Sequence, residues 1–398
     1  MKKDDPTPDP EATPMHFPYM FWAHNEMAAS TWSLSTSGMP VPDAKLLGPE
    51  ELPPDLATAA NLDHPGHLAM PAFEAAIAER YGVDPSRIVL TMGASAALHL
   101  VATTYFRDGA RVAVDVPSYQ PFRALPPYFG ASLCEVERRE HEDWRLDPGD
   151  VAAALDAPGT PQTGPAHVFF TNPNNPTGAL SSAELLHELG TIAGDRGGIL
   201  ICNESYMDLV PVADQVRCAT TIPRSITIGS LTKPYGMGAL RLGWLVLGED
   251  MAGERTRLLD HLYMGYVDPP TPAIRIGLRA VKRLDDLRAP YNNFAAECRP
   301  LLYRWAQEMP GVSAFCSGLG LTIFARIENL DATGATQSGP TDTMAFSKFA
   351  AEHFDLAVTP GEFFGVPGCL RLGFGTPREH LEGALQQLTK ALEAWRTK

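Results

Sequence analysis

Cysteine is scarce in this chain, and the few residues present lie far apart. The six are Cys134, Cys202, Cys218, Cys298, Cys316 and Cys369, and none forms a Cys-x-x-Cys pair or joins histidines at the spacing of a metal site. Scattered thiols without a secretory signal are typical of a reducing compartment. We therefore expect a cytoplasmic protein with no metal centre.

Positive charge and long apolar runs are also in short supply. The 398 residues carry 32 lysines and arginines against 47 aspartates and glutamates, a formal net charge of −15. Nucleic acids and anionic membranes attract basic surfaces, so neither is an expected partner. No apolar run approaches the roughly 18 residues of a membrane span. The length suits a large domain with a smaller one.

The chain divides by composition into four parts. Residues 1–14 are rich in Asp, Pro, Lys and Thr, which predicts a disordered tail. Residues 15–48 carry five large aromatics, which must pack against either the core or a binding site: Phe17, Tyr19, Phe21, Trp22 and Trp32. We expect this segment to cover the site and to pack with the smaller domain. The other two parts are a large domain over residues 49–290 and a small domain over residues 291–398.

Short apolar runs alternate with helical stretches in the large part. Strands are predicted at 87–91, 112–116, 167–170, 198–202, 225–228 and 244–247, with helices at 94–106 and 182–195. Such alternation implies a largely parallel sheet whose ligands bind at the carboxyl ends of the strands. In the small part, Pro290 opens a helix toward Gln307. Strands at 321–327 and 370–374, helices at 343–353 and 379–395, and a loop at 331–340 complete an α/β unit.

The densest chemistry lies in Ser230-Leu-Thr-Lys233, with Arg241 eight residues later. Lys233 can form a Schiff base with an aldehyde cofactor, which requires loss of its proton. A serine hydroxyl and an arginine fork can bind the phosphate of such a cofactor. The alternative is a surface loop with scattered basic residues.

Other candidates follow the predicted strands. Ala94 and Ser95 open a helix whose N–H groups can bind phosphate, although Ser95 could instead cap it. The two Asn-Pro steps of residues 171–178 form a rigid turn, from which an asparagine amide could donate to a phenolate oxygen. Tyr206 could bond the same oxygen. Tyr119 could stack on a flat ring or pack in the core.

An arginine also stands within a late apolar strand. Arg371 lies in Leu370-Arg371-Leu372-Gly373 and is costly to bury unless it is paired. Its partner is either a substrate carboxylate or an internal Asp or Glu.

Taken in order, these motifs resemble the class I/II aminotransferases, pyridoxal-phosphate enzymes of fold type I, from about Gly38 to Phe374. The resemblance implies a mostly parallel seven-stranded sheet flanked by helices, with a smaller α/β C-terminal domain. It also implies pyridoxal 5′-phosphate as cofactor and a homodimer with shared active sites, in which a loop near 263–271 serves the partner's site.

The resemblance assigns roles to residues. Lys233 is the Schiff-base lysine and the acid–base group at the α-carbon. Ala94, Ser95, Ser230 and Arg241 bind the phosphate, and Tyr119 stacks on the ring. Asn175 and Tyr206 bond the ring hydroxyl. Gly38 belongs to the segment that closes over the substrate, and Arg371 binds the α-carboxylate.

Two positions depart from the family pattern. Asn203 stands where the family carries the aspartate that keeps the pyridine nitrogen protonated. Its carbonyl could accept from a protonated nitrogen, or its amide could donate to an unprotonated one, but neither supplies that charge. The neighbouring Glu204 points to the opposite strand face. Asn61 replaces a tyrosine that reaches the partner's phosphate, a role that His64 could take.

The departure at Asn203 leaves two functions open. One is an aminotransferase of specialised metabolism. The other is β-elimination, racemisation, decarboxylation or oxidative deamination, which suffer less from a weak electron sink. A fold-borrowing regulator, an inert homologue and a carbon–carbon ligase are disfavoured alternatives. Arg371 implies an α-amino acid or a conjugate that bears this head group. The aromatic segment favours a bulky side chain, and Asp268 a cationic one.

Overall fold

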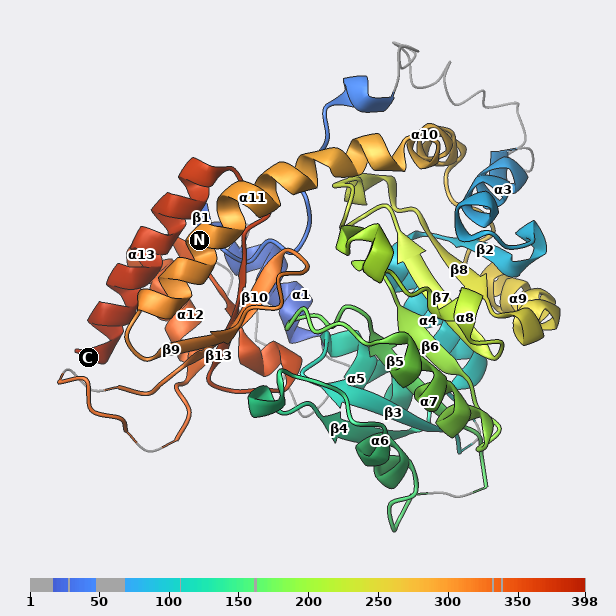
Figure 1. Ribbon diagram of the computed structural model, residues 1–398, viewed down its shortest axis with the longest axis horizontal. Helices are drawn as coiled ribbons and strands as arrows, with labels where there is room; N and C mark the ends of the chain where they lie inside the picture. Colours follow the sequence, from blue (N-terminus) through green and yellow to red (C-terminus); the bar gives the residue numbers. More distant parts are fainter. Residues whose placement is uncertain are drawn as a thin grey trace, which may run out of the picture.

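A seven-stranded sheet forms the centre of the larger unit in the computed structural model (Figure 1). Its strands, in spatial order, are β2 (Ile88–Thr91), β8 (Gly243–Leu247), β7 (Ser225–Ser230), β6 (Leu200–Asn203), β5 (Ala166–Thr171), β3 (Arg111–Val116) and β4 (Ser132–Glu137). All pairings are parallel except the two that β8 makes. The predicted mostly parallel seven-stranded sheet is therefore confirmed. The edge strand β4 was missed because its burial alternates, unlike the continuous apolar runs of the inner strands.

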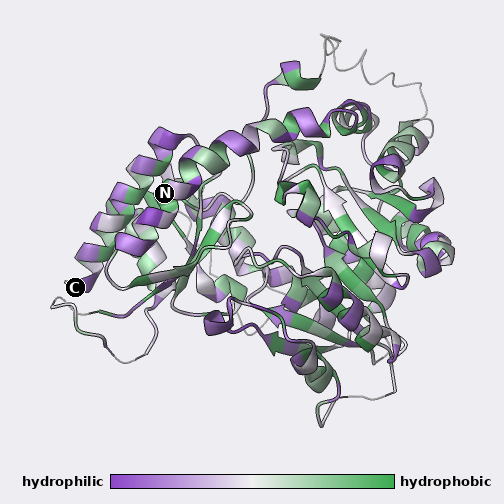
Figure 2. Ribbon diagram, viewed as in Figure 1, coloured by the Kyte–Doolittle hydropathy of each residue, from purple (hydrophilic) through white to green (hydrophobic). Residues whose placement is uncertain are grey.

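Helices cover both faces of this sheet because its strands are apolar on both sides (Figure 2). One face carries α4 (Gly93–Tyr105), α5 (Gln120–Tyr128) and α9 (Arg255–Gly265). The other carries α3 (Ala69–Tyr81), α6 (Pro148–Leu155), α7 (Ala183–Gly194), α8 (Cys218–Thr221) and α10 (Thr271–Val281). Period-two alternation separates neighbours: Phe169 packs with α4 and α5, whereas Val168 and Phe170 pack with α6 and α7.

The smaller unit packs three helices against a second sheet. The sheet has the order β12 (Thr359–Pro360), β13 (Cys369–Gly373), β10 (Thr322–Ile327) and β9 (Val312–Phe315). The helices are α11 (Leu284–Glu308), α12 (Thr343–Phe354) and α13 (Arg378–Arg396). Figure 1 shows α11 running from the larger unit to the smaller one.

The N-terminal segment joins the two units. It begins with α1 (Pro18–Trp22) and a π-helix, η1 (Ala23–Met27). Strand β1 (Trp32–Ser33) then pairs in parallel with β11 (Leu356–Ala357) of the smaller unit. The backbone N–H of Met39 donates to the carbonyl of Lys233 at 2.9 Å. A Cβ at Gly236 would collide with the carbonyl of Pro40, so the segment passes very close to this loop.

The structure describes residues 17–27, 29–47, 69–107, 109–160, 163–330, 333–337 and 339–397. The predicted tail, the start of the large domain at residue 49, and Asn61 and His64 lie outside these ranges. The prediction that Pro290 opens a helix was wrong, because α11 begins at Leu284 and accommodates Pro290 and Pro300 within it. The predicted boundary at 290/291 thus falls inside α11, and the division into domains stays a prediction. Among the described helices, none has the length and apolarity that a membrane crossing requires.

Candidate active site

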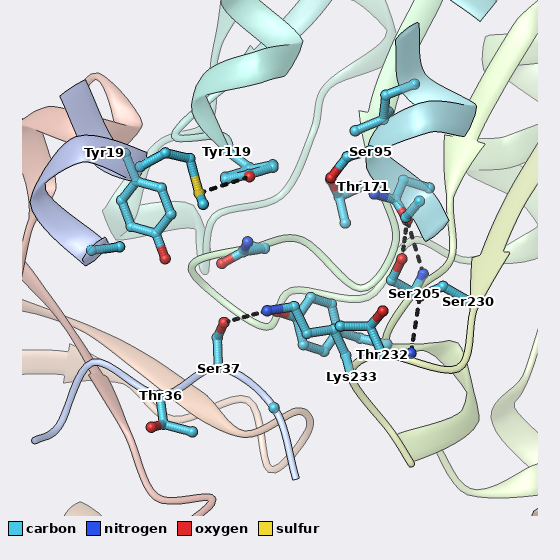
Figure 3. A pocket seen from close by; sticks show the side chains of 18 of the residues that line it. Tyr19, Thr36, Ser37, Ser95, Tyr119, Thr171, Ser205, Ser230, Thr232 and Lys233 are labelled. Atoms are coloured by element: carbon cyan, nitrogen blue, oxygen red, sulfur yellow. Dashed lines mark hydrogen bonds between the residues drawn. The ribbon is translucent and has the colours of Figure 1, made fainter. Parts of the chain in front are cut away.

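A cavity of about 630 Å³ opens at the carboxyl ends of the parallel strands, between the two units. Every predicted site residue lines it: Gly38, Ala94, Ser95, Tyr119, Asn175, Asn203, Tyr206, Ser230, Lys233, Arg241 and Arg371. Figure 3 shows Tyr19 and Ser37 of the N-terminal segment facing Ser95, Ser205 and Ser230 of the larger unit. Three cations line the cavity, Lys233, Arg241 and Arg371, and none of its described lining residues is an aspartate or glutamate.

Lys233 follows β7 and reaches across the cavity to the N-terminal segment. Its Nζ donates to Ser37 Oγ at 2.9 Å (Figure 3). Gly38 lies directly against the lysine stem, since a Cβ there would be 3.6 Å from Lys233 Cδ. The lysine is therefore held by residues some 196 positions earlier in the chain, and the alternative of an unattached surface loop is excluded.

The N-terminus of α4 lines the part of the cavity that is suited to binding an anion. Its N-cap, Met92, provides no side-chain cap, so Ser95 lies inside the first turn and is not the cap. Free N–H groups at a helix start bind anions. Arg241 has a left-handed backbone (φ 52°), and a Cβ at Gly93 would lie 2.8 Å from Arg241 Nη2. Glycine at position 93 therefore lets the guanidinium approach the helix terminus.

Arg371 of β13 is buried, with 1% of its surface exposed. Its Nη2 donates to Tyr19 Oη at 3.0 Å and to the Ser35 carbonyl at 2.9 Å, while Nε has no partner in the described part of the chain. No described carboxylate lies within ion-pair distance, which excludes an internal salt bridge among these residues. A buried guanidinium without a counter-charge is suited to a carboxylate ligand.

The asparagines in the turn after β5 have two roles: some stabilise the turn, and one lines the cavity. Asn172 exchanges hydrogen bonds with the Ser181 backbone, and Asn174 donates to Asp115 and accepts from Thr177. These internal bonds fix the turn. Asn175 instead lines the cavity, where its Oδ1 lies 3.4 Å from Arg371 Nη1.

Strand β6 ends with two residues that face opposite ways. Asn203 lines the cavity, and its Oδ1 accepts from the Ser205 N–H at 3.0 Å and from Ser205 Oγ at 2.6 Å. Glu204 turns to the other side of the sheet, where it accepts from the Cys218 N–H, Thr227 Oγ1 and Arg217. The prediction that Glu204 cannot replace a cavity carboxylate is confirmed.

Sequence reasoning missed several residues of the cavity. The sequence distinguishes Tyr19 only as one of several aromatics in residues 15–48. Burial alone would raise the pKa of Tyr19, but the charges of Arg371 and Lys233 and the hydrogen bond from Arg371 outweigh it and lower the pKa. Ser37 and Ser205 carry no pattern that distinguishes them from other serines. Thr171 precedes the asparagine turn, so its place at the end of β5 could have revealed it.

The comparisons with known proteins agree with this geometry. The model of the family "Aminotransferase class I and II" matches residues 37–388. The chain belongs to this family. Its enzymes use pyridoxal 5′-phosphate, which is therefore the cofactor of this chain as well.

Relatives of this aminotransferase-family chain carry several names. Capreomycidine synthase from Streptomyces vinaceus is 28% identical over 80% of this chain and 78% of its own length. An aspartate aminotransferase from Streptomyces avermitilis is 25% identical over 81% and 80%. Among solved structures, a pyridoxal-phosphate-dependent aminotransferase from Streptococcus suis has a TM-score of 0.80 at 20% identity, covering 96% of this chain and 99% of its own. These likenesses confirm fold type I.

The cavity fits the cofactor on its own chemistry. The buried hydroxyls of Thr171 and Tyr206 line it and have no hydrogen-bond partner among the described residues. Buried polar groups are rarely left unpaired, so these two hydroxyls are suited to hydrogen bonds with a ligand. The uncapped start of α4 and the Arg241 guanidinium beside it suit a phosphate group.

Proposed function

We propose that this enzyme removes the α-proton of an L-amino acid and completes a reaction that returns the cofactor to its starting form, as in elimination, or in oxidative deamination with dioxygen as the electron acceptor. The observation that carries the proposal is the neutral Asn203 in a cavity whose described lining holds three cations and no carboxylate. Bound pyridoxal phosphate draws electrons from the α-carbon of an amino acid, and an adjacent carboxylate strengthens this pull. Without that carboxylate, complete transfer of the amino group is disfavoured.

The chain's own residues supply binding and proton transfer. Lys233 holds the cofactor and, when released, moves the proton at the α-carbon. Ser230, Arg241 and the N–H groups of Ala94 and Ser95 bind the phosphate. Tyr119 covers the ring, and Asn175 and Tyr206 bond its hydroxyl.

Arg371 binds the α-carboxylate and so favours some reactions over others. Tyr19 and the Ser35 carbonyl hold the guanidinium in place by hydrogen bonds to Nη2. A carboxylate paired with a buried cation is stabilised as an anion, which opposes the loss of its charge in decarboxylation. Deprotonation of the α-carbon by Lys233 is therefore the favoured first step.

The side chain of the substrate is bulky or apolar in this proposal. The cavity is also lined by Met20, Ala23 and Met27 of α1 and η1, together with His24. Asp268 lines a separate cavity of its own chain with Met70 and Arg255; it lies in the loop proposed to serve the partner's site, where it would favour a cationic side chain.

Aminotransfer is the second candidate, because several relatives, such as the one from Streptomyces avermitilis, are named aspartate aminotransferases. The first relative above is named a synthase, which supports reactions other than aminotransfer in this family. A single-turnover titration with L-amino acids, without a keto-acid acceptor, separates the two. We expect α-proton exchange with deuterated solvent and product formation while the cofactor spectrum returns to its initial form. A stable aminated cofactor with one keto acid per site would refute the proposal.

We also propose a homodimer with shared sites. Its support is the exposed apolar surface at the end of α9 and the following loop, where Met264 is 89% and Val267 64% exposed. Such a patch is typical of an interface. A monomeric mass by light scattering, independent of protein concentration, would contradict it.

A further inference from the structure

The orientation of the Asn203 amide is fixed by its neighbours. A backbone N–H can only donate, so the Ser205 N–H at 3.0 Å identifies its partner on Asn203 as the oxygen. Ser205 Oγ, at 2.6 Å, donates to the same oxygen. With Oδ1 occupied by two donors, the Nδ2 amide group takes the remaining direction of the side chain.

No described protein group accepts from this amide. Asn203 lines the cavity, and its side-chain hydrogen bonds to the described residues use only Oδ1, so Nδ2 is open to the cavity. Glu204, the nearest carboxylate in sequence, is engaged behind the strand. The amide is therefore a donor that can bond an acceptor inside the cavity.

The charges that line the cavity also bear on whether the ring nitrogen of the cofactor is protonated. Lys233, Arg241 and Arg371 contribute positive charge, and the described lining offers no negative side chain. The phosphate of the bound cofactor would offset part of this positive charge, but protonation of the ring nitrogen is favoured by an adjacent carboxylate, and the described lining has none. The hydroxyl of Thr171, which pairs with Asn203 in the β5–β6 register, is a neutral acceptor and cannot compensate.

We propose that Asn203 donates its amide N–H to the pyridine nitrogen of the cofactor, which is held unprotonated, and that the backbone N–H of residue 205 sets this direction. The inference rests on the proposed function and gives it a chemical cause, because a neutral ring is the weaker electron acceptor.

The test is the ¹⁵N chemical shift of the ring nitrogen in the resting holoenzyme loaded with ¹⁵N-labelled pyridoxal phosphate. In the parent protein we expect the downfield signal of an unprotonated pyridine across the pH range of the folded protein. Asn203→Asp should move it far upfield, because the aspartate keeps one oxygen on Ser205 and turns the other toward the ring. Ser205→Ala is the matched control: the backbone N–H still holds Oδ1, so the signal should stay where it is in the parent.

The outcomes separate this inference from the proposed function. A protonated nitrogen in the parent overturns the inference, whatever reaction the enzyme performs. A protonated nitrogen in Ser205→Ala alone overturns the role given to the Ser205 backbone. An unprotonated nitrogen together with complete aminotransfer would leave the inference standing and refute the proposed function.

Discussion

Two groups of charged side chains lie on opposite sides of the end of β6, and they are neutralised in different ways. Behind the strand, Arg217 binds Glu204 and Asp208, and Arg80 binds Asp208 at 2.8 Å. In the cavity, the described residues provide no carboxylate for Lys233, Arg241 or Arg371. The first group balances its own charge and serves the fold. In the function proposed above, the second is balanced by the phosphate of the cofactor and the carboxylate of the substrate.

The largest expected effect is on the cavity side. Lys233→Ala should lower kcat by at least about 10²–10⁴-fold, the contribution typical of a positioned proton-transfer group. It should change the free energy of unfolding by less than about 0.5 kcal/mol, because the side chain makes a single hydrogen bond to the described residues, to Ser37. Steady-state rates and urea unfolding measure both quantities. The exposed Lys348→Ala is the control, and comparable losses in the two variants would contradict the account.

Replacing one arginine of each group by alanine tests whether the two groups of charges have different roles. Arg371→Ala should reduce kcat/KM by about 10–100-fold, the value of charge-assisted hydrogen bonds. Arg217→Ala should instead cost about 3–5 kcal/mol of unfolding free energy, because it leaves the buried Glu204 without a cation and Asp208 with Arg80 alone. If Arg217→Ala proved as stable as the parent, the distinction between structural and ligand-binding cations would fail.

The affinity for the cofactor tests the role proposed for Arg241 in binding the phosphate. Arg241→Ala should raise the cofactor dissociation constant by about tenfold or more, since a charge-assisted bond to phosphate contributes about 1.5–3 kcal/mol. Fluorescence titration of the apoenzyme measures it. Arg257→Ala, on the surface near Thr104, should leave the constant unchanged. Equal affinities for parent and Arg241→Ala would remove this residue from the phosphate site.

The smallest expected effect is the pH dependence of stability that comes from Glu204, which is paired with Arg217 behind the strand. Burial raises the pKa of Glu204 from 4.5 to about 7, against the lowering effect of Arg217. Since the folded pKa is raised, the contribution of Glu204 to stability is full below pH 4.5 and is lost as pH rises through about 7. Glu204→Gln should remove this decline, as measured by the difference in unfolding free energy between parent and variant at each pH.

Titration of His167 changes the unfolding free energy with pH in the opposite direction. The measurement therefore uses the difference between the parent and Glu204→Gln. Burial lowers the pKa of His167 from 6.5 to about 4, and its contribution is lost as pH falls toward 4. This slope is common to parent and Glu204→Gln and cancels in the comparison. A difference that does not vary with pH would show that Glu204 titrates equally in the folded and unfolded states.

Sequence reasoning located the cavity because its residues follow strands. Lys233, Asn203 and Tyr119 each come just after a buried apolar run, and parallel strands bring such positions to one edge. It failed where long-range contacts decide. Pro290 suggests a helix start, yet packing in α11 tolerates it within the helix. The approach of Ser37 to Lys233 depends on the path of the N-terminal segment, which no local pattern encodes.

The direction of the Asn203 amide could not be predicted either. Both orientations are compatible with the sequence, and only the backbone N–H of Ser205 distinguishes them. Local spacing identified the residue, and tertiary geometry decided its chemistry.

The most direct test of the central claim is the partition of a single turnover in parent and Asn203→Asp, with the amino acid that reacts fastest. The fraction of sites that end with aminated cofactor and keto acid is compared with the fraction that release product and recover the starting spectrum. The account predicts a small aminated fraction in the parent and a clear increase in Asn203→Asp. An identical partition in both proteins would contradict it.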